Sequence, residues 1–358
     1  MAGTKPMNTI HNGHRPTIRD VARQAGVSVG TVSRVVNGNA SVQAEIRNRV
    51  HTAIEALGYA PNMMAQSMRS RSTQTIGCII REISIPALAA FVRAAHDVLY
   101  EAGYALLLTN SEGDIERERE LLRRLSRRQA DGIILGHYTP MDGEFDQFLR
   151  ALNVPIVLVD RDQPSWADWV SADHFHSSFR ITKHLLALGH TRIAIITGTE
   201  QLFPARERLR GYRAAHQEHG VTVEPELVRV GSFLAKYGFN FMSSLLNLKA
   251  PPTAVVAGGI DMLGGILRAI RTAGLEIPRD ISVVAASDSD LAELHTPPIS
   301  VERWDHAEVG RTAARLLLER IAGRAGPEPH HILLPTELVF RESVARPRQS
   351  ARRTSKAG

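Results

Sequence analysis

The chain has 358 residues, of which 43% are hydrophobic and 22% are charged, a composition typical of a soluble globular protein with two or three domains. Its one cysteine, Cys78, excludes an intrachain disulfide framework and is expected to be a buried, inert thiol. No uncharged apolar run approaches the roughly 20 residues of a membrane span, and the polar N-terminus has no apolar export segment. We therefore expect a cytoplasmic protein.

The net charge of +6 is unevenly distributed. Residues 1–73 hold nine Lys/Arg against three acids, which gives +6, and residues 346–358 hold five basic residues and no acid, which gives +5. The remaining residues, 74–345, must therefore carry −5. A basic head on an acidic body orients a protein on the phosphates of nucleic acid. We interpret the basic tail as a disordered solubilising end rather than a second DNA contact.

Residues 17–38 have the pattern of two short helices joined by a tight turn. Apolar residues recur at helical spacing as far as Ala25, and Gly26 ends that helix where a left-handed residue is needed. Ser28 predicts the N-cap of a second helix that runs to about Val36. This pattern favours a helix-turn-helix whose outer face enters a major groove of DNA. An ordinary helical hairpin on the surface is the alternative.

A third helix predicted at 44–57 would complete a small all-α domain, and Gly58 would end it. A helix-competent segment and a polar run follow, so we place the domain boundary near residue 73. The predicted parts are a disordered extension (1–15), a helix-turn-helix domain (16–60), a hinge helix and linker (61–74), a core (75–345) and a basic tail (346–358).

Strand and helix signals alternate through the core. The predicted strands are 76–80, 104–108, 132–135, 156–159, 193–196, 227–230, 254–256, 282–285, 299–301 and 332–340. The predicted helices are about 87–102, 115–127, 143–151, 175–188, 205–218, 237–247, 261–273 and 306–322. Repeated βαβ units predict an α/β fold of doubly wound parallel sheets in two lobes.

We assign residues 75–172 and 291–325 to the N-lobe and residues 173–290 and 326–345 to the C-lobe, with 332–340 able to pass back between the lobes. Open α/β lobes bind ligands beyond the carboxyl ends of their strands. Two facing lobes therefore predict a cleft that can hold a small molecule.

Motifs spread along the chain carry a family resemblance. Those of the head are Thr17–Ala22, Gly26–Ser28, Thr31–Asn37 and Tyr59–Asn62, and those of the body are Gly189–His190, Arg208–Tyr212, Pro252–Ala254 and Ile277–Val284. Over residues 16–345 the sequence resembles the LacI/GalR family of bacterial transcriptional regulators. The resemblance implies a repressor, a homodimer or tetramer, a palindromic double-stranded operator and a core like the periplasmic sugar-binding proteins. It also implies allosteric control by a small-molecule effector, a sugar or a sugar-derived acid.

The resemblance assigns DNA contacts to the two helices of the head and to the hinge. The residues concerned are Thr17, Ser28, Val29, Gly30, Thr31, Ser33, Arg34, Asn37, Asn62, Ala65 and Met68. Val29 and Gly30 occupy the positions that most often differ between members that read different operators, and Arg34 occupies a usual base or phosphate contact. Met68 stands where the family typically has a leucine wedged into the minor groove.

For the effector, the predicted contacts come from both lobes. They are Arg206, Arg208, Phe233, Ser287, Asp288, Leu88 and Asp160. Arg208 matches an arginine that holds a sugar hydroxyl or a carboxylate, with a surface arginine as the alternative, and Phe233 would stack on the ligand or pack in the core. Ser287 replaces a common ligand-binding aspartate, and Gly259-Ile260 replaces a polar pair. These departures weaken the expectation of a neutral sugar.

Two other classes of protein share this two-lobed plan. An enzyme would need a catalytic motif, and the phosphate-loop, nucleophile-elbow and zinc-protease patterns are absent from the sequence. We therefore expect no catalytic residues and no cofactor. We also expect no metal site, because His174, His176, His330 and His331 lack a completing ligand cluster and are interpreted as surface residues. A solute-binding transport component would have no use for residues 17–68.

Overall fold

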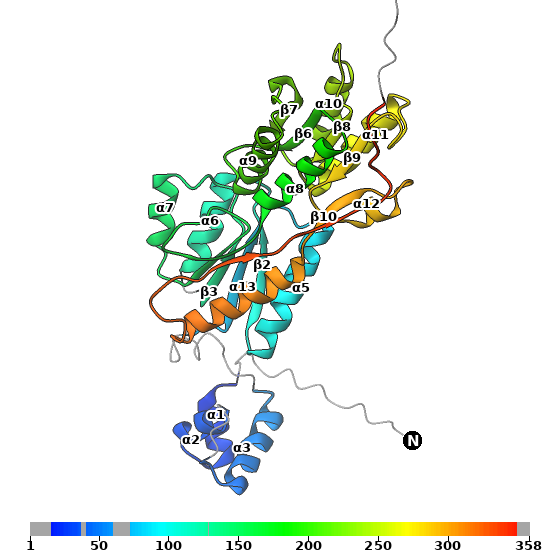
Figure 1. The fold of residues 1–358 in the computed structure, drawn as a ribbon. Helices are drawn as coiled ribbons and strands as arrows, with labels where there is room; N and C mark the ends of the chain where they lie inside the picture. The colour runs from blue at the N-terminus through cyan, green and yellow to red at the C-terminus, as the bar shows by residue number, and fades with distance from the viewer. Residues whose placement is uncertain (1–15, 37–40, 60–71, 128, 349–358) are drawn as a thin grey trace, which may run out of the picture. The chain divides into compact units, whose positions relative to one another are not determined.

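The computed structural model describes residues 16–36, 41–59, 72–127 and 129–348 (Figure 1). The chain forms two compact units, Met1–Thr73 and Gln74–Gly358. None of the helices within the described ranges is both long enough and apolar enough to span a membrane. Cys78 is fully buried, and burial raises the pKa of its thiol to about 12, as expected of an inert cysteine.

Within its described residues, the first unit contains three helices, α1 (Ile18–Ala25), α2 (Val29–Val36) and α3 (Ala44–Leu57). Their shared core is Val21, Ala22, Ala25, Val32, Val35, Val42, Val50 and Ala53. Gly26 adopts φ +64° at the end of α1, and the Ser28 hydroxyl accepts a hydrogen bond of 3.1 Å from the Thr31 N–H at the start of α2. The predicted turn and N-cap are therefore confirmed.

In the second unit, the first sheet contains β1 (Thr75–Ile80), β2 (Ala105–Asn110), β3 (Gly132–Leu135), β4 (Ile156–Val159), β5 (Asp168–Ala172) and β11 (His331–Leu334). Its strand order is β11-β5-β4-β3-β1-β2, and every pairing is parallel. The helices α5 (Pro86–Glu101) and α13 (His306–Ile321) cover one face, and α6 (Ile115–Ser126) and α7 (Gly143–Arg150) cover the other.

The second sheet contains β6 (Ile193–Gly198), β7 (Val228–Gly231), β8 (Ala254–Ala257), β9 (Ser282–Ala285), β10 (Ser300–Arg303) and β12 (Glu337–Val339). Its order is β12-β10-β9-β8-β6-β7, with β12 antiparallel to β10. On one face lie α8 (His174–Ala187) and α9 (Phe203–Glu218), and on the other α10 (Ala235–Leu246) and α11 (Ile260–Thr272). A one-turn helix, η1 (Pro225–Leu227), and α12 (Asp290–Leu294) complete this lobe. The predicted doubly wound α/β fold is confirmed.

The predicted strands and helices of the core are present, except that the predicted strand 332–340 is two strands, β11 and β12, which lie in different sheets. The assignment of the last segments to lobes also needs correction. The chain crosses between the sheets after β5, after β10 and between β11 and β12. β10 therefore belongs to the second sheet, although residues 291–325 were assigned to the N-lobe, and β11 belongs to the first sheet, although 326–345 were assigned to the C-lobe. Short apolar strands carry no signal for the sheet that they join. β5 and α12 were not predicted.

Helix pairs on these sheets cross at glycines. Gly211 of α9 lies against the backbone of α8, Gly310 of α13 against α5, and Gly265 of α11 against α10. A Cβ at Gly265 would overlap the Ala235 carbonyl and lie 2.7 Å from the Phe239 nitrogen, closer than atoms can pack. Each of these close crossings lets two helices share one face of a sheet.

Gly265→Ala should therefore destabilise the core by about 1–3 kcal/mol, because backbone cannot move aside as a flexible side chain can. The adjacent Gly264 is a matched control, since its Cβ would meet only the Leu291 Cδ2, at 3.4 Å. Gly264→Ala should raise stability by about 0.5–1 kcal/mol through helix propensity. Urea unfolding followed by circular dichroism measures both, and equal effects of the two substitutions would contradict the close crossing.

Candidate functional site

The outer face of α2 is the candidate DNA-reading surface. Val32 and Val35 are buried against the core of the head, while Gly30 and Arg34 are exposed. Among the residues that the structure describes, the Arg34 guanidinium contacts only the Gly30 carbonyl and the Thr31 hydroxyl of its own helix, both at a long 3.4 Å. Contacts of this length are weak and leave the side chain available to a ligand.

The other predicted contacts of the head differ in their surroundings. Ser28 is exposed, whereas Val29, Thr31 and Ser33 are half-buried beside it. Thr17 is the N-cap of α1, where its backbone N–H and hydroxyl donate to the Asp20 carboxylate at 2.9 and 2.7 Å. Four predicted contacts lie outside the described residues: Asn37, Asn62, Ala65 and Met68.

A cavity of about 150 Å³ lies between the two lobes of the core. Five of the predicted effector residues line it, two from the first lobe and three from the second: Leu88, Asp160, Arg208, Phe233 and Ser287. Arg206 and Asp288 do not line it. The cavity lies beyond the carboxyl ends of strands in both sheets, where open α/β sheets bind ligands.

Arg208 is the central polar group of the cavity wall and is only 5% exposed, which excludes the alternative of a surface arginine. Its Nη1 donates to the Gly258 carbonyl at 2.9 Å, and its Nη2 lies 3.2 Å from the His174 Nδ1. On the other side of the ring, the His174 Nε2 lies 2.6 Å from the Asp160 carboxylate. This chain of hydrogen bonds joins the second lobe to the first.

The geometry fixes the tautomer of His174. A guanidinium can only donate, so Nδ1 must accept from Arg208, and the ring proton must sit on Nε2 and be donated to Asp160. His174 is 1% exposed, and the interpretation of this residue as a surface histidine was therefore wrong. His174 is buried because the first turn of α8 lies at the crossing between the lobes. A single histidine at the start of a helix does not predict this burial from the sequence. His176, His330 and His331 are exposed.

Burial governs the charges of this network. It lowers the pKa of the His174 ring, and the nearby Arg208 charge lowers it further, so the ring is neutral. It also opposes ionisation of Asp160, yet the hydrogen bond from His174 and the adjacent guanidinium groups hold the pKa of this carboxyl well below its usual range. Burial lowers the pKa of Arg208 to about 10, which leaves the guanidinium charged at neutral pH.

Phe233 forms an apolar part of the wall, and its ring packs directly against two glycines. A Cβ on Gly259 would lie 2.6 Å from its ring, and a Cβ on Gly198 would overlap the same ring. Both glycines are thus required for this position of Phe233.

The two remaining predicted effector residues form ion pairs outside the cavity. Arg206 forms an ion pair with Asp162 of the first lobe. Asp288 accepts two hydrogen bonds of 3.0 Å from Arg341 and one of 2.9 Å from Arg303. The structure does not bring the Asp288 carboxylate to the cavity, because these arginines, distant in sequence, hold it.

Several lining residues were missed by the sequence analysis: Arg81, Arg161, Asp261, Trp304 and His306. Arg81 directly follows β1, and Asp160-Arg161 directly follow β4. The rule that ligands bind beyond the carboxyl ends of strands could have identified these two arginines. Trp304 and His306 lie at the second lobe crossing, which short strands do not reveal. No group of three His, Cys, Asp or Glu side chains in the described part of the chain could hold a metal ion.

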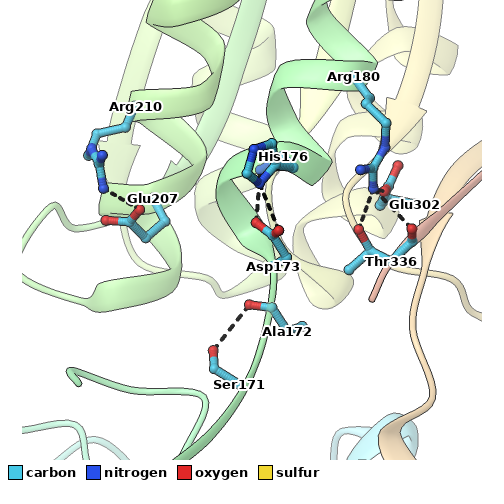
Figure 2. A network of polar contacts seen from close by, with 9 residues as sticks. All are labelled: Ser171, Ala172, Asp173, His176, Arg180, Glu207, Arg210, Glu302 and Thr336. Atoms are coloured by element: carbon cyan, nitrogen blue, oxygen red, sulfur yellow. Dashed lines mark hydrogen bonds and ion pairs between the residues drawn. The ribbon is translucent and has the colours of Figure 1, made fainter. Parts of the chain in front are cut away.

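Polar contacts also join the lobe crossings to one another (Figure 2). Arg180 of α8 donates to the carboxylate of Glu302 and to both the carbonyl, at 3.0 Å, and the hydroxyl of Thr336. Glu302 precedes the second crossing and Thr336 lies in the third. Asp173, in the first crossing, caps α8 by accepting from the His176 N–H at 3.0 Å. Arg180 therefore links α8, the helix that follows the first crossing, to the chain at the second and third crossings.

Comparison with known proteins gives consistent matches along the chain. Residues 17–62 match the family model described as bacterial regulatory proteins, lacI family, and residues 182–344 match a periplasmic binding protein-like domain. The repressor PurR of Photobacterium profundum is 31% identical over 334 residues, covering 92% of this chain and 98% of the relative. The ribose operon repressor of Escherichia coli K12 is 35% identical over 311 residues, covering 85% of this chain and 93% of the relative.

Solved structures agree with these relatives. The lac repressor dimer bound to operator and the anti-inducer ONPF superposes with a TM-score of 0.81 at 29% identity, covering 93% of this chain and all of that one. The complex of the regulator CelR with cellobiose has a TM-score of 0.69 at 32% identity, covering 92% of this chain and all of that one. The chain belongs to the LacI family of bacterial regulatory proteins, and it is a DNA-binding transcriptional repressor with an effector-binding core rather than an enzyme.

Proposed function

We propose that this repressor acts in the cytoplasm as a homodimer on a palindromic operator, and that the ligand of the cavity sets its operator affinity through Arg208. The observation that carries the proposal is the chain of hydrogen bonds from Arg208 through His174 to Asp160 of the other lobe. A ligand that recruits Arg208 must alter this link and hence the relative position of the lobes. Coupling of this kind is typically worth about 1–3 kcal/mol and is reciprocal between effector and operator.

For the head, the proposed base contacts are on the exposed face of α2, with Arg34 as the principal side chain. Gly30 contributes no side chain there, although a Cβ at this position would meet nothing closer than the Ser28 hydroxyl, at 3.8 Å. The space above Gly30 is therefore open to a base pair. Met68 is the proposed minor-groove wedge, and it lies outside the described residues.

For the effector, the names of two relatives, a ribose operon repressor and a regulator in complex with cellobiose, support a sugar or a sugar-derived acid. Ser287 and Gly259 offer no carboxylate or amide to bind sugar hydroxyls, and Arg208 is a donor. Of the two classes, this donor-rich wall favours the acid.

Arg34→Ala should weaken specific operator binding by about 1–3 kcal/mol, because a base-edge contact is lost, and should change binding to scrambled DNA much less. Arg23, exposed on α1, is the charge-matched control. Arg23→Ala should leave the ratio of the two affinities unchanged. Gel-shift titrations on an operator selected from a random DNA pool measure this ratio, and an unchanged ratio for Arg34→Ala would remove Arg34 from base readout.

Arg208→Lys should abolish release from the operator by small molecules, because an ammonium group cannot make the paired contacts of a guanidinium fork. Arg206→Lys, two residues earlier on α9 and outside the cavity, is the matched control and should respond normally. Fluorescence anisotropy of labelled operator DNA, titrated with a panel of sugars and small carboxylic acids, measures the response. Normal release of the Arg208→Lys protein would locate the effector elsewhere.

The neutral state of His174 predicts a pH dependence of stability. Burial lowers the folded-state pKa of His174 and lowers that of the buried His137 to about 4, so below about pH 6.5 the unfolded chain binds more protons than the folded one. The free energy of unfolding should therefore fall as the pH falls through this window, by at most about 1.4 kcal/mol per pH unit for each such histidine. His174→Asn should reduce the slope. Urea unfolding at several pH values in this window measures the free energy of unfolding of the wild-type and His174→Asn proteins. If this free energy depends on pH equally in both proteins, His174 is not neutral in the folded state.

A further inference from the structure

Two buried polar atoms at the cavity have no partner. The Arg208 Nε and the Ser287 hydroxyl form no hydrogen bond within the described part of the chain, and Ser287 is only 3% exposed. Both residues line the cavity. Buried donors are nearly always paired in folded proteins, so an unpaired set at a cavity wall indicates a missing acceptor.

The charges of the wall point the same way. Three arginines, Arg81, Arg161 and Arg208, line the cavity with two aspartates, Asp160 and Asp261. None of these arginines forms an ion pair with a carboxylate of the described chain; Arg208 contacts a carbonyl and a neutral ring, and Arg161 donates to the carbonyls of His137 and Asp160. The Asp160 carboxylate already accepts from His174 and, at 3.1 Å, from Ser171. The wall therefore holds three guanidinium groups against two carboxylates and is one negative charge short of balance.

Most of the rest of the wall is apolar. The apolar residues that line it include Leu88, Phe91, Phe233, Ile260, Trp304 and Val309. A neutral sugar carries hydroxyl groups around the edge of its ring, and those facing such a wall would be buried without partners. A cavity of about 150 Å³ is also the size of an engineered apolar cavity that holds a single benzene ring.

We propose that the effector of this cleft is a small carboxylic acid with an apolar body, one ring or a short branched chain, whose carboxylate binds Arg208 and Ser287. This inference rests on the proposed function, because it names the ligand class of the same cleft. It keeps the carboxylate of the acid favoured above but replaces the sugar body by an apolar one, so it distinguishes the ligand from both a neutral sugar and a sugar acid.

The test is calorimetric titration of the full chain with four probes: phenylacetate, its neutral isostere phenylacetamide, D-galactose and D-galacturonate. Phenylacetate should bind at millimolar concentration or tighter, and at least about tenfold tighter than phenylacetamide, because only the carboxylate pairs with the guanidinium. Phenylacetate should also bind more tightly than either sugar. Stronger binding of a sugar or of the amide, or no binding of phenylacetate, overturns the inference.

Ser287→Asp sharpens the test by placing a second carboxylate where the ligand's carboxylate would lie. It should weaken phenylacetate binding about tenfold or more through like-charge repulsion and change phenylacetamide binding little. Ser287→Ala removes the hydroxyl contact without adding a charge, and it should weaken both probes by less than about tenfold, because each presents an oxygen that can accept from the hydroxyl. Equal losses of the two probes in Ser287→Asp would contradict the proposed position of the carboxylate. If this variant does not fold, the selectivity of the wild-type protein among the four probes still decides the matter.

Operator binding distinguishes this inference from the proposed function. If a sugar binds and releases the operator while phenylacetate does neither, the ligand class is wrong and the regulatory proposal stands. If phenylacetate binds in the cleft as expected but leaves operator affinity unchanged, the ligand class stands and control through Arg208 is wrong.

Discussion

The hydrogen-bond chain from Gly258 through Arg208 and His174 to Asp160 is the interaction on which the cleft depends. Because a guanidinium only donates, it forces the histidine to accept, and the histidine in turn must donate to the carboxylate. One buried cation thereby sets the tautomer of the ring, the contact between the lobes and the charge that a ligand must bring. Removing any member leaves the next one without its partner, so these properties cannot be altered separately.

Local chemistry in the sequence was enough to predict most of the fold. A glycine at the left-handed position and a serine at the helix start predicted the turn of the head, and the alternation of strand and helix signals predicted the core. The sheet to which β10 and β11 belong could not be predicted in this way. Strand pairing is a contact between residues far apart in sequence, and a short apolar strand is compatible with either sheet.

The same distinction applies to the cleft. Family motifs led to Arg208, Phe233 and Ser287, which all line the cavity. They also suggested Asp288, whose two arginine partners come from distant segments that no motif connects to it. His174 was overlooked because its role depends on the lobe crossing, where the direction of a side chain follows from tertiary structure alone.

The close packing of the Phe233 ring against Gly198 and Gly259 constrains how the effector specificity of this protein can evolve. Many new ligands would need a polar side chain at position 259, yet any side chain there collides with the aromatic ring. The ring must first be replaced by a smaller residue, and that intermediate would lose an apolar wall before gaining a polar contact. Substitutions at 233 and 259 are thus expected to be strongly epistatic, and the order in which they occur determines whether a functional path exists.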